Sequence, residues 1–158
     1  MRGKREAGFT LIEILVVLAL LGVLALVVVP NLGGLLGRGE EQGYNSDTKA
    51  LQAAVDAYYT DPTTKVSGLR QYPTKNGTGG TPTYAGGAWT VDDFWVYFDK
   101  LINKGYLSDP PASAGAKDRL TTAPTYGTGS YNWYVDANGK VKSKTATGQD
   151  GFQAGIYP

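Results

Sequence analysis

Gly8-Phe9-Thr10-Leu11-Ile12-Glu13 joins a basic leader to a long apolar run, and this stretch decides the fold. No side chain from position 14 to position 29 carries a charge. With residues 9–12 added, the run reaches the roughly 20 residues that a helix needs to span a bilayer. Glu13 lies inside the run, where a carboxylate costs roughly 2 to 4 kcal/mol. An acid in such a segment usually has a functional partner, and the obvious partner is a cation.

These six residues resemble the processing signature of type IV pilins and of the related type II secretion pseudopilins. In this family a prepilin peptidase cuts after the glycine. The resemblance therefore implies cleavage between Gly8 and Phe9, and N-methylation of the new amino terminus on Phe9. It also implies that Glu13 pairs with the terminal amine of Phe9 in a neighbouring subunit during assembly. That amine is the cation that the energetics of a buried acid requires.

Three other interpretations of the N-terminus are open. A secretory signal peptide also has a basic start, but its apolar core runs only about 7 to 15 residues before a small-residue cleavage site. A plain signal anchor would keep Arg2, Lys4 and Arg5 in the cytoplasm, and it fits everything except Glu13 and the Gly-Phe boundary. A buried core helix would not need the basic leader.

The composition suits one anchor and one small globular head, because 158 residues leave a soluble part long enough to bury a modest core. The chain has 15 Lys and Arg and 14 Asp and Glu. Loss of residues 1–8 would remove three basic and one acidic side chain, leaving 12 and 13. Since the basic residues are scattered, direct binding of nucleic acid is not expected.

The chain contains no cysteine and no histidine. It therefore lacks the disulfide that closes the C-terminal region in many type IV pilins, and something else must hold that region. It also lacks an imidazole base, a thiol nucleophile and an ordinary zinc site. Asp92 and Asp93 are adjacent, but neighbours in sequence do not face each other on a helix, so they are interpreted as first-turn acids. These absences favour a protein that is not an enzyme.

Two residues are expected to weaken the apolar helix over residues 9–30. Pro30 cannot donate a hydrogen bond to the carbonyl of Leu26, and its ring crowds that turn, so a kink or a local opening is expected. Gly22 is a second weak point. The resemblance implies that the segment between them can stretch or melt inside a filament. For a lone chain in lipid a simple kink is favoured, because the span must satisfy its own backbone groups.

Residues 31–61 are predicted to continue the helix. The stretch 33–39 has four glycines, each costing about 1 kcal/mol relative to alanine, so continuity is uncertain there. Pro62 is expected to end the helix, since the residue before a proline avoids helical geometry. Helical spacing predicts one face that covers the head, formed by Tyr44, Asp47, Leu51, Ala54, Val55 and Tyr58.

Residues 62–158 are predicted to form the head. Residues 63–87, rich in Thr, Gly and Pro, predict an ordered loop with little regular structure. A second helix is predicted from Thr90 to Lys104, with Gly105 as its stop. Alternation over residues 130–135, a turn over 136–139 and the following Lys-Val-Lys predict a β-hairpin that packs on the long helix. The stripe expected to bury the second helix is Phe94, Tyr97, Phe98, Leu101 and Ile102.

Several short stretches resemble the major pseudopilin of type II secretion in particular. They are Val28-Val29-Pro30-Asn31-Leu32, Ala57-Tyr58, Tyr72-Pro73-Thr74, Gly105-Tyr106-Leu107 and Asp109-Pro110. A tryptophan and a glycine that often follow that Asp-Pro are missing here. The branch of the family therefore stays open at this point.

Three further features have competing interpretations. Asn76-Gly77-Thr78 matches a glycosylation sequon, a pattern that also arises by chance. Asp136, Asn138 and Asp150 offer oxygen ligands to calcium, which several pseudopilins bind near the C-terminus, although turn chemistry alone explains them and no cofactor is expected. The 11 tyrosines suggest electron transfer or adhesion, but most of the rings fall on core-like faces.

The sequence thus predicts an α+β, pilin-like fold, in which a long helix packs on a small antiparallel sheet head. The expected parts are a cleaved leader (1–8), a transmembrane and filament-core helix (9–30), an amphipathic continuation (31–61) and the head (62–158). The expected function is a structural subunit of a type IV pilus-like filament, stored in the inner membrane and extracted by assembly machinery. The alternatives are a major pseudopilin and, from another class, a membrane-anchored binding module that does not polymerise.

Overall fold

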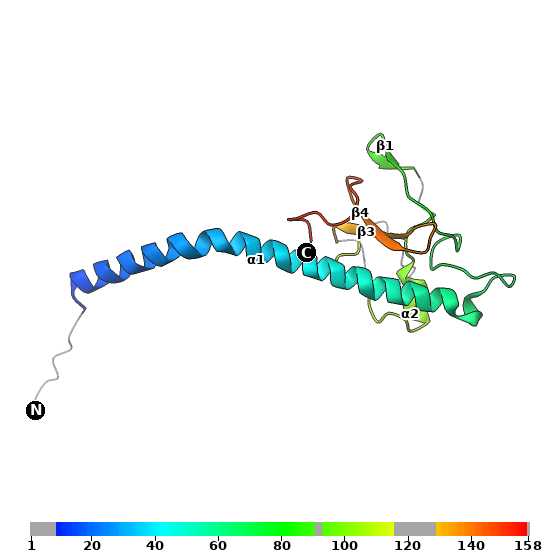
Figure 1. Cartoon of the computed structure of the whole chain (residues 1–158), viewed down its shortest axis with the longest axis horizontal. Helices are drawn as coiled ribbons and strands as arrows, with labels where there is room; N and C mark the ends of the chain where they lie inside the picture. Colours follow the sequence, from blue (N-terminus) through cyan, green and yellow to red (C-terminus); the bar gives the residue numbers. More distant parts are fainter. Residues whose placement is uncertain (1–8, 91–92, 116–128, 158) are drawn as a thin grey trace, which may run out of the picture. The chain divides into compact units, whose positions relative to one another are not determined.

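The structure is a computed structural model that describes residues 9–90, 93–115 and 129–157, with the backbone alone for residues 25–36. The chain divides into two compact units, Met1–Arg38 and Gly39–Pro158. One helix, α1 (Leu11–Thr60), has its first part in one unit and its second part in the other. Figure 1 labels this helix and the elements of the head.

The long helix α1 continues without a break across the proline and the glycine-rich stretch that were expected to disturb it. Pro30 and the glycine-rich stretch 33–39 lie within its 50 residues. Across the part of the chain that the structure describes, no helix combines the length and the apolar character needed to cross a membrane. The transmembrane assignment of residues 9–30 is therefore not confirmed by the structure and stays a prediction.

The end of α1 agrees with the expectation from Pro62. The helix ends at Thr60, and a single 3-10 turn, η1 (Pro62–Thr64), follows. Asp61 caps this turn by accepting a hydrogen bond from the Thr63 backbone N–H at 2.7 Å. Pro62 suits the first position of the turn because a proline there loses no hydrogen bond that the turn would make.

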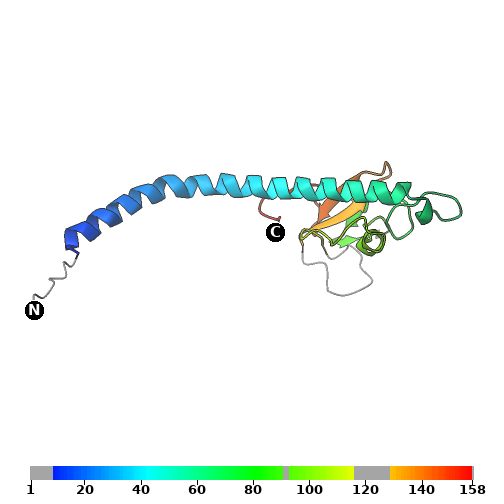
Figure 2. The same ribbon diagram turned by 90° about the horizontal axis from the view of Figure 1, so that it is seen from below.

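The predicted C-terminal hairpin is confirmed. It consists of β3 (Tyr131–Val135) and β4 (Val141–Thr145), paired antiparallel from Tyr131 opposite Thr145 to Val135 opposite Val141. One face of β3 enters the core, where it meets the buried face of α1, and Figure 2 shows the hairpin alongside the helix. The core residues that α1 and the hairpin contribute are Leu51, Ala54, Val55, Tyr58, Tyr131, Trp133, Val135 and Val141.

The second helix is shorter than the sequence predicted. Among the described residues of the predicted span 90–104, only α2 (Phe98–Asn103) is helical, and Gly105 follows with a φ of 74°. Residues 94–96 pair with β3 instead: the Val96 N–H donates to the Trp133 carbonyl, and the Val135 N–H donates to the Phe94 carbonyl. Thr90 caps no helix and bonds Thr83. Residues 91–92, including Asp92, lie outside the described part.

A second hairpin, missed from the sequence, interrupts the loop that was expected over residues 63–87. It joins β1 (Tyr84–Ala85) to β2 (Ala88–Trp89) through Gly86 and Gly87, whose φ angles are 60° and 79°. Two glycines between short apolar pairs are typical of a tight hairpin turn, so the signal was present in the sequence. A long N-terminal helix and small antiparallel sheets make up the predicted α+β, pilin-like arrangement.

Candidate functional site

The start of α1 is built by Thr10 and Glu13. The Glu13 carboxylate accepts hydrogen bonds from the Thr10 backbone N–H at 2.7 Å and from its hydroxyl at 2.9 Å. In return, the Thr10 hydroxyl accepts from the Glu13 backbone N–H at 3.3 Å. This reciprocal pattern is a capping box, which satisfies backbone donors that a helix start leaves without partners. The capping box was not predicted, although Thr-x-x-Glu is its ordinary sequence signal.

The capping box gives Glu13 a polar partner inside its own chain. The partner expected from the sequence was a cation of a neighbouring subunit. In the structure, Phe9 is 84% exposed directly before the capping pair, and Gly8 lies outside the described residues. The structure therefore keeps Phe9 and Glu13 within one turn of each other at the helix start, with the Phe9 side chain free to contact another molecule.

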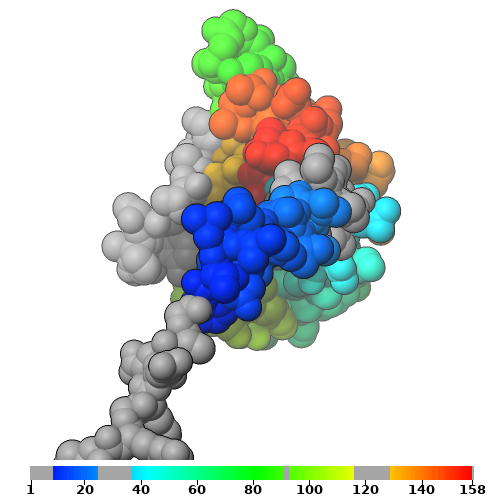
Figure 3. All heavy atoms as spheres, turned by 90° about the vertical axis from the view of Figure 1, so that its left-hand side faces the viewer, coloured from blue at the N-terminus to red at the C-terminus, as the bar shows by residue number. Residues whose placement is uncertain are grey.

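The first part of α1 presents apolar side chains to the surroundings along its described length. Every described side chain from 9 to 24 is exposed, and no atom from outside the helix lies within 4 Å of the Cβ position of Gly22. Figure 3 draws these residues as dark blue spheres. The large apolar side chains among them are Phe9, Leu11, Ile12, Ile14, Leu15, Val16, Val17, Leu18, Leu20, Leu21, Val23 and Leu24. An apolar surface of this extent needs cover from other molecules.

The C-terminal segment is held without a disulfide. The Tyr157 hydroxyl donates to the Asp47 carboxylate at 2.9 Å, and its ring lies against Gly43 of α1. The Gly155 N–H donates to the Glu40 carboxylate at 2.7 Å. Burial, and next the hydrogen bond to Asp47, raise the pKa of Tyr157 to about 12. These contacts fasten the last residues to α1 in the place of the missing cysteines.

The two carboxylates among the calcium candidates are already engaged with other groups. One oxygen of Asp136 accepts from the Asn138 and Lys140 N–H groups, both at 2.9 Å, and the other lies 2.8 Å from the Lys142 ammonium. Asp150 lies 2.6 Å from the ammonium of Lys144, whose side chain is 9% exposed. Among the described residues, no cluster of three or more His, Cys, Asp or Glu side chains could hold a metal ion. The donor set does not fit calcium, because lysines provide the positive charges.

The ionisation of Asp136 follows from these contacts. Burial alone would raise the pKa of this carboxyl, but the hydrogen bonds from Lys142, Lys140 and Asn138 outweigh burial and lower it below its ordinary value. The hydrogen bond to Asp136 in turn raises the pKa of Lys142. Asp136 thus stabilises the turn between β3 and β4 in its charged form.

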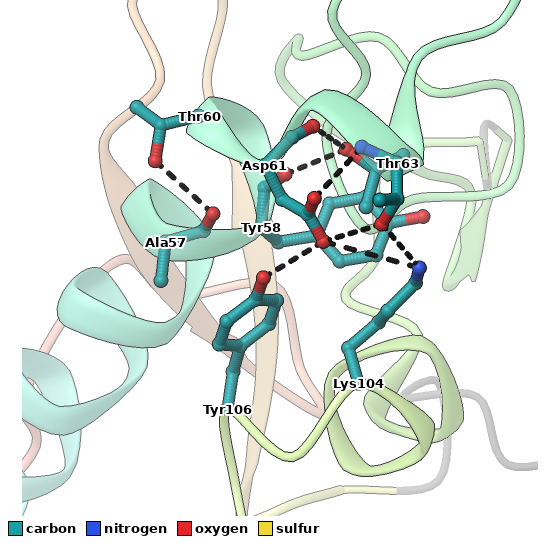
Figure 4. A network of polar contacts seen from close by, with 8 residues as sticks. Ala57, Tyr58, Thr60, Asp61, Thr63, Lys104 and Tyr106 are labelled. Atoms are coloured by element: carbon teal, nitrogen blue, oxygen red, sulfur yellow. Dashed lines mark hydrogen bonds and ion pairs between the residues drawn. The ribbon is translucent and has the colours of Figure 1, made fainter.

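A second carboxylate organises the end of α1. Figure 4 shows Asp61 accepting hydrogen bonds from Thr63 and from the Tyr106 hydroxyl, with the Lys104 ammonium 3.9 Å away. The bonds from the Thr63 backbone and side chain, in that order, hold the pKa of Asp61 below its usual value. Lys104 also donates to the Thr63 hydroxyl at 2.6 Å. The network ties the end of α1 to the segment that follows α2.

The remaining candidates are placed as follows. Asn76 is exposed, as a glycosylation site must be, and its modification stays a prediction. Pro30 lies in α1, where its side chain is not among the described atoms. Tyr44 stacks on Trp133 with ring centroids 5.3 Å apart, and Tyr59 stacks on Tyr72 at 4.5 Å. These pairs contribute to the packing of the head.

Comparison with known proteins first identifies the class of the N-terminus. Residues 3–29 match the family described as "Prokaryotic N-terminal methylation motif". The matched range contains Gly8, Phe9 and Glu13. The resemblance to prepilin-type proteins is therefore confirmed for this part of the chain.

The curated relatives are more specific. The chain is 44% identical over 79 residues to the "Type II secretion system core protein G" of Klebsiella michiganensis, covering 48% of this chain and 55% of the relative. Proteins of the same name from Aeromonas hydrophila and Escherichia coli K12 are 45% identical over 69 residues and 43% identical over 72 residues. These two matches cover 41% and 46% of this chain, and 48% and 45% of the relatives. The chain thus spans about half the length of the curated relatives it matches. No solved structure gives a significant match.

Proposed function

We propose that this protein is a structural subunit of a type II secretion pseudopilus, processed after Gly8 and assembled from the inner membrane into a periplasmic filament. The observation that carries the proposal is the prepilin-type motif over residues 3–29, together with relatives named as core protein G of that system. Of the two filaments considered from the sequence, the relatives favour the pseudopilus over a surface pilus. The role is structural, without catalysis.

The exposed apolar part of α1 supports this proposal. A subunit that passes from membrane to filament needs a helix whose apolar surface is covered by lipid first and by other subunits afterwards. The described residues 9–24 present such a surface. Its burial against neighbouring copies is a heterologous contact, which does not close and so extends into a filament. The partners are other copies, the prepilin peptidase, the assembly machinery and membrane lipid.

Glu13 has two roles in this proposal. Within one chain it caps α1 through Thr10, and during assembly it pairs with the methylated amine of Phe9 in the adjacent subunit. A glutamine keeps the capping role, since Glu and Gln both serve at this position of a capping box, but it cannot form the ion pair. The two roles can therefore be separated by one substitution.

The test compares Glu13→Gln with Glu13→Ala and with the unmodified chain. Intact mass and N-terminal sequence establish whether the chain begins at methylated Phe9, and electron microscopy of sheared fractions scores filaments. Both variants are expected to be processed and inserted into the membrane, and both are expected to block filament growth. Normal filaments from Glu13→Gln would remove the ion pair and leave only the cap. A retained residue 1–8 leader on the unmodified chain would leave a membrane-anchored binding module instead.

A further inference from the structure

Two asparagines of the head are each followed by glycine, and the two pairs lie in different surroundings. The pairs are Asn76-Gly77 and Asn138-Gly139, the only places in the sequence where glycine follows asparagine. Both asparagine side chains are exposed. Both glycines have a positive φ, 74° at Gly77 and 80° at Gly139. The sequence therefore contains the same dipeptide twice in similar exposure, and the contacts around each pair distinguish them.

An asparagine followed by glycine can react with its own backbone. The glycine nitrogen attacks the side-chain amide carbon of the asparagine, a C–N bond forms, and the amide nitrogen leaves as ammonia with the proton that the glycine nitrogen gives up. The product is a five-membered succinimide ring, which water opens at one of its two carbonyl carbons. One opening gives aspartate, and the other gives isoaspartate, in which the main chain runs through the side-chain carbon. Glycine favours ring closure because it has no Cβ and its backbone turns freely.

The atoms of the Asn76-Gly77 pair that react are loosely held. The exposed Asn76 side chain makes no hydrogen bond with another described residue. The Gly77 N–H donates to the Thr74 carbonyl at 3.4 Å, which is longer than the usual range of about 2.7 to 3.2 Å. The Gln71 side chain lies over Gly77, but its amide nitrogen is 3.5 Å from the Leu69 carbonyl, so this half-buried side chain can move aside. The Gly77 nitrogen is therefore available for attack.

The Asn138-Gly139 pair is held firmly by one residue. Asp136 accepts the Asn138 and Lys140 N–H groups on its carboxylate, both at 2.9 Å. The Asp136 backbone carbonyl accepts the Gly139 N–H at 3.0 Å. Attack by the Gly139 nitrogen requires that its own bond and the bond of the Asn138 N–H break. Each such bond corresponds to about a tenfold change in an equilibrium, so the reaction is slowed by about tenfold or more.

We propose that Asn76 is a site of spontaneous modification in the folded head, where it converts to aspartate and isoaspartate while Asn138 stays intact. Water is the only co-reactant that the conversion consumes. This fate excludes glycosylation of the same residue, because a glycan would be attached to the amide nitrogen that leaves as ammonia. The inference does not depend on the proposed filament function. The fold selects one of two identical dipeptides for reaction.

Isoaspartate at position 76 adds one carbon to the main chain of a turn that is held on both sides. The Tyr72 N–H donates to the Gly77 carbonyl at 2.8 Å, and the Thr74 hydroxyl donates to the Thr78 carbonyl at 2.8 Å. Both bonds join residues before position 76 to residues after it. The carbonyl of the buried Thr74 also accepts from the Lys100 ammonium of α2 at 2.5 Å. A longer main chain therefore weakens the packing of this turn on α2, whereas aspartate, with a main chain of normal length, does not.

Ageing of the purified chain tests the proposal. The full-length chain is kept folded in detergent in a warm, slightly alkaline buffer for several weeks, and samples are digested at mildly acidic pH for peptide mass spectrometry. Conversion appears as a gain in mass equal to one water added and one ammonia lost. A methyltransferase specific for isoaspartate counts the isoaspartate by methyl transfer. The matched control is the same incubation in urea, which removes the hydrogen bonds that distinguish the two pairs.

In the folded chain, position 76 is expected to convert about tenfold or more faster than position 138, and in urea the two rates should become similar. A folded chain in which Asn76 stays intact, or in which Asn138 converts as fast, overturns the proposal. A difference in urea as large as that in the folded chain also overturns it, because the fold would not be the cause. Chain recovered from cells with a glycan on Asn76 overturns it as well.

A second measurement tests the effect of isoaspartate on the head. The thermal unfolding midpoint of the aged chain is compared with that of fresh Asn76→Asp, which has the new charge and a main chain of normal length. Aged Asn76→Gln controls for other damage, because glutamine must close a six-membered ring and reacts far more slowly. The aged unmodified chain is expected to unfold about 3 °C or more below both controls. Equal midpoints, with isoaspartate present at position 76, overturn the proposed effect on the turn.

Discussion

Gly43→Ala tests the packing that holds the C-terminus. An ideal Cβ at position 43 would lie 2.7 Å from Cε1 and 2.8 Å from Cζ of Tyr157, so the tyrosine ring must move. Inside a helix, alanine is favoured over glycine by about 1 kcal/mol. Displacing the ring loses the hydrogen bond to the Asp47 carboxylate, about 1.5 kcal/mol, and the contact with Tyr131, about 0.5 kcal/mol.

The helix preference for alanine stabilises the head, whereas the loss of the Tyr157 contacts destabilises it. The presence of the Tyr157 ring therefore decides the sign of the net effect. In the unmodified background, Gly43→Ala is expected to lower the free energy of unfolding by about 1 kcal/mol. In a Tyr157→Ala background, no ring stands in the way, so the same substitution should raise it by about 1 kcal/mol. The coupling between the two positions is then about 2 kcal/mol.

The assay is urea unfolding of the full-length chain kept monomeric in detergent, followed by tryptophan fluorescence. All three tryptophans lie in the head, at positions 89, 95 and 133, so the signal reports on the unit that contains Tyr157. Comparing the four variants gives the coupling free energy. If Gly43→Ala stabilises the head by about 1 kcal/mol in both backgrounds, Tyr157 does not pack on Gly43 and the reasoning fails.

Two further predictions concern the β3–β4 turn. The pKa of Asp136 is lowered in the folded head, so its stabilisation is present above the unfolded value near 3.8 and is lost as the pH falls through the folded value. Unfolding midpoints are measured for the unmodified chain and for Asp136→Asn from about pH 6 down to about pH 2. Asp136→Asn should unfold at a lower midpoint near pH 6, and the difference between the two midpoints should shrink as the pH falls. A difference that stays constant would contradict this. Because the carboxylates of Asp136 and Asp150 are paired with lysine ammonium groups, neither EDTA nor added calcium should change the thermal unfolding midpoint. A rise of the midpoint with calcium would support the calcium site considered from the sequence.

The local features of the fold were predictable from short stretches of sequence. The stop of α1 follows from the geometry that Pro62 imposes on the residue before it, and the β3–β4 hairpin follows from alternation around Asp136-Ala137-Asn138-Gly139. The capping box at Thr10 and Glu13 and the glycine turn between β1 and β2 were missed, but both depend only on neighbouring residues. Sequence patterns suffice in such cases because the deciding interactions span a few positions.

Residues 94–97 show where local patterns fail. Their spacing suits a helix stripe, yet the backbone groups of Phe94 and Val96 bond β3, almost 40 residues further along the chain. Helix propensities differ by less than about 1 kcal/mol per residue, so pairing with a distant strand overrides them. The helix therefore begins only at Phe98.

The sequence by itself determined the prepilin-type N-terminus, the long helix and the hairpin, since each depends on chemistry within a few neighbouring residues. Only the tertiary structure decided that Tyr157 and Glu40 fasten the C-terminus, and that lysines take the carboxylates considered for calcium. It also decided that Val66 and Leu69 are exposed on a turn of the head. Contacts such as that of Tyr157 with Asp47, 110 positions apart, depend on how the chain folds back, which no local pattern specifies.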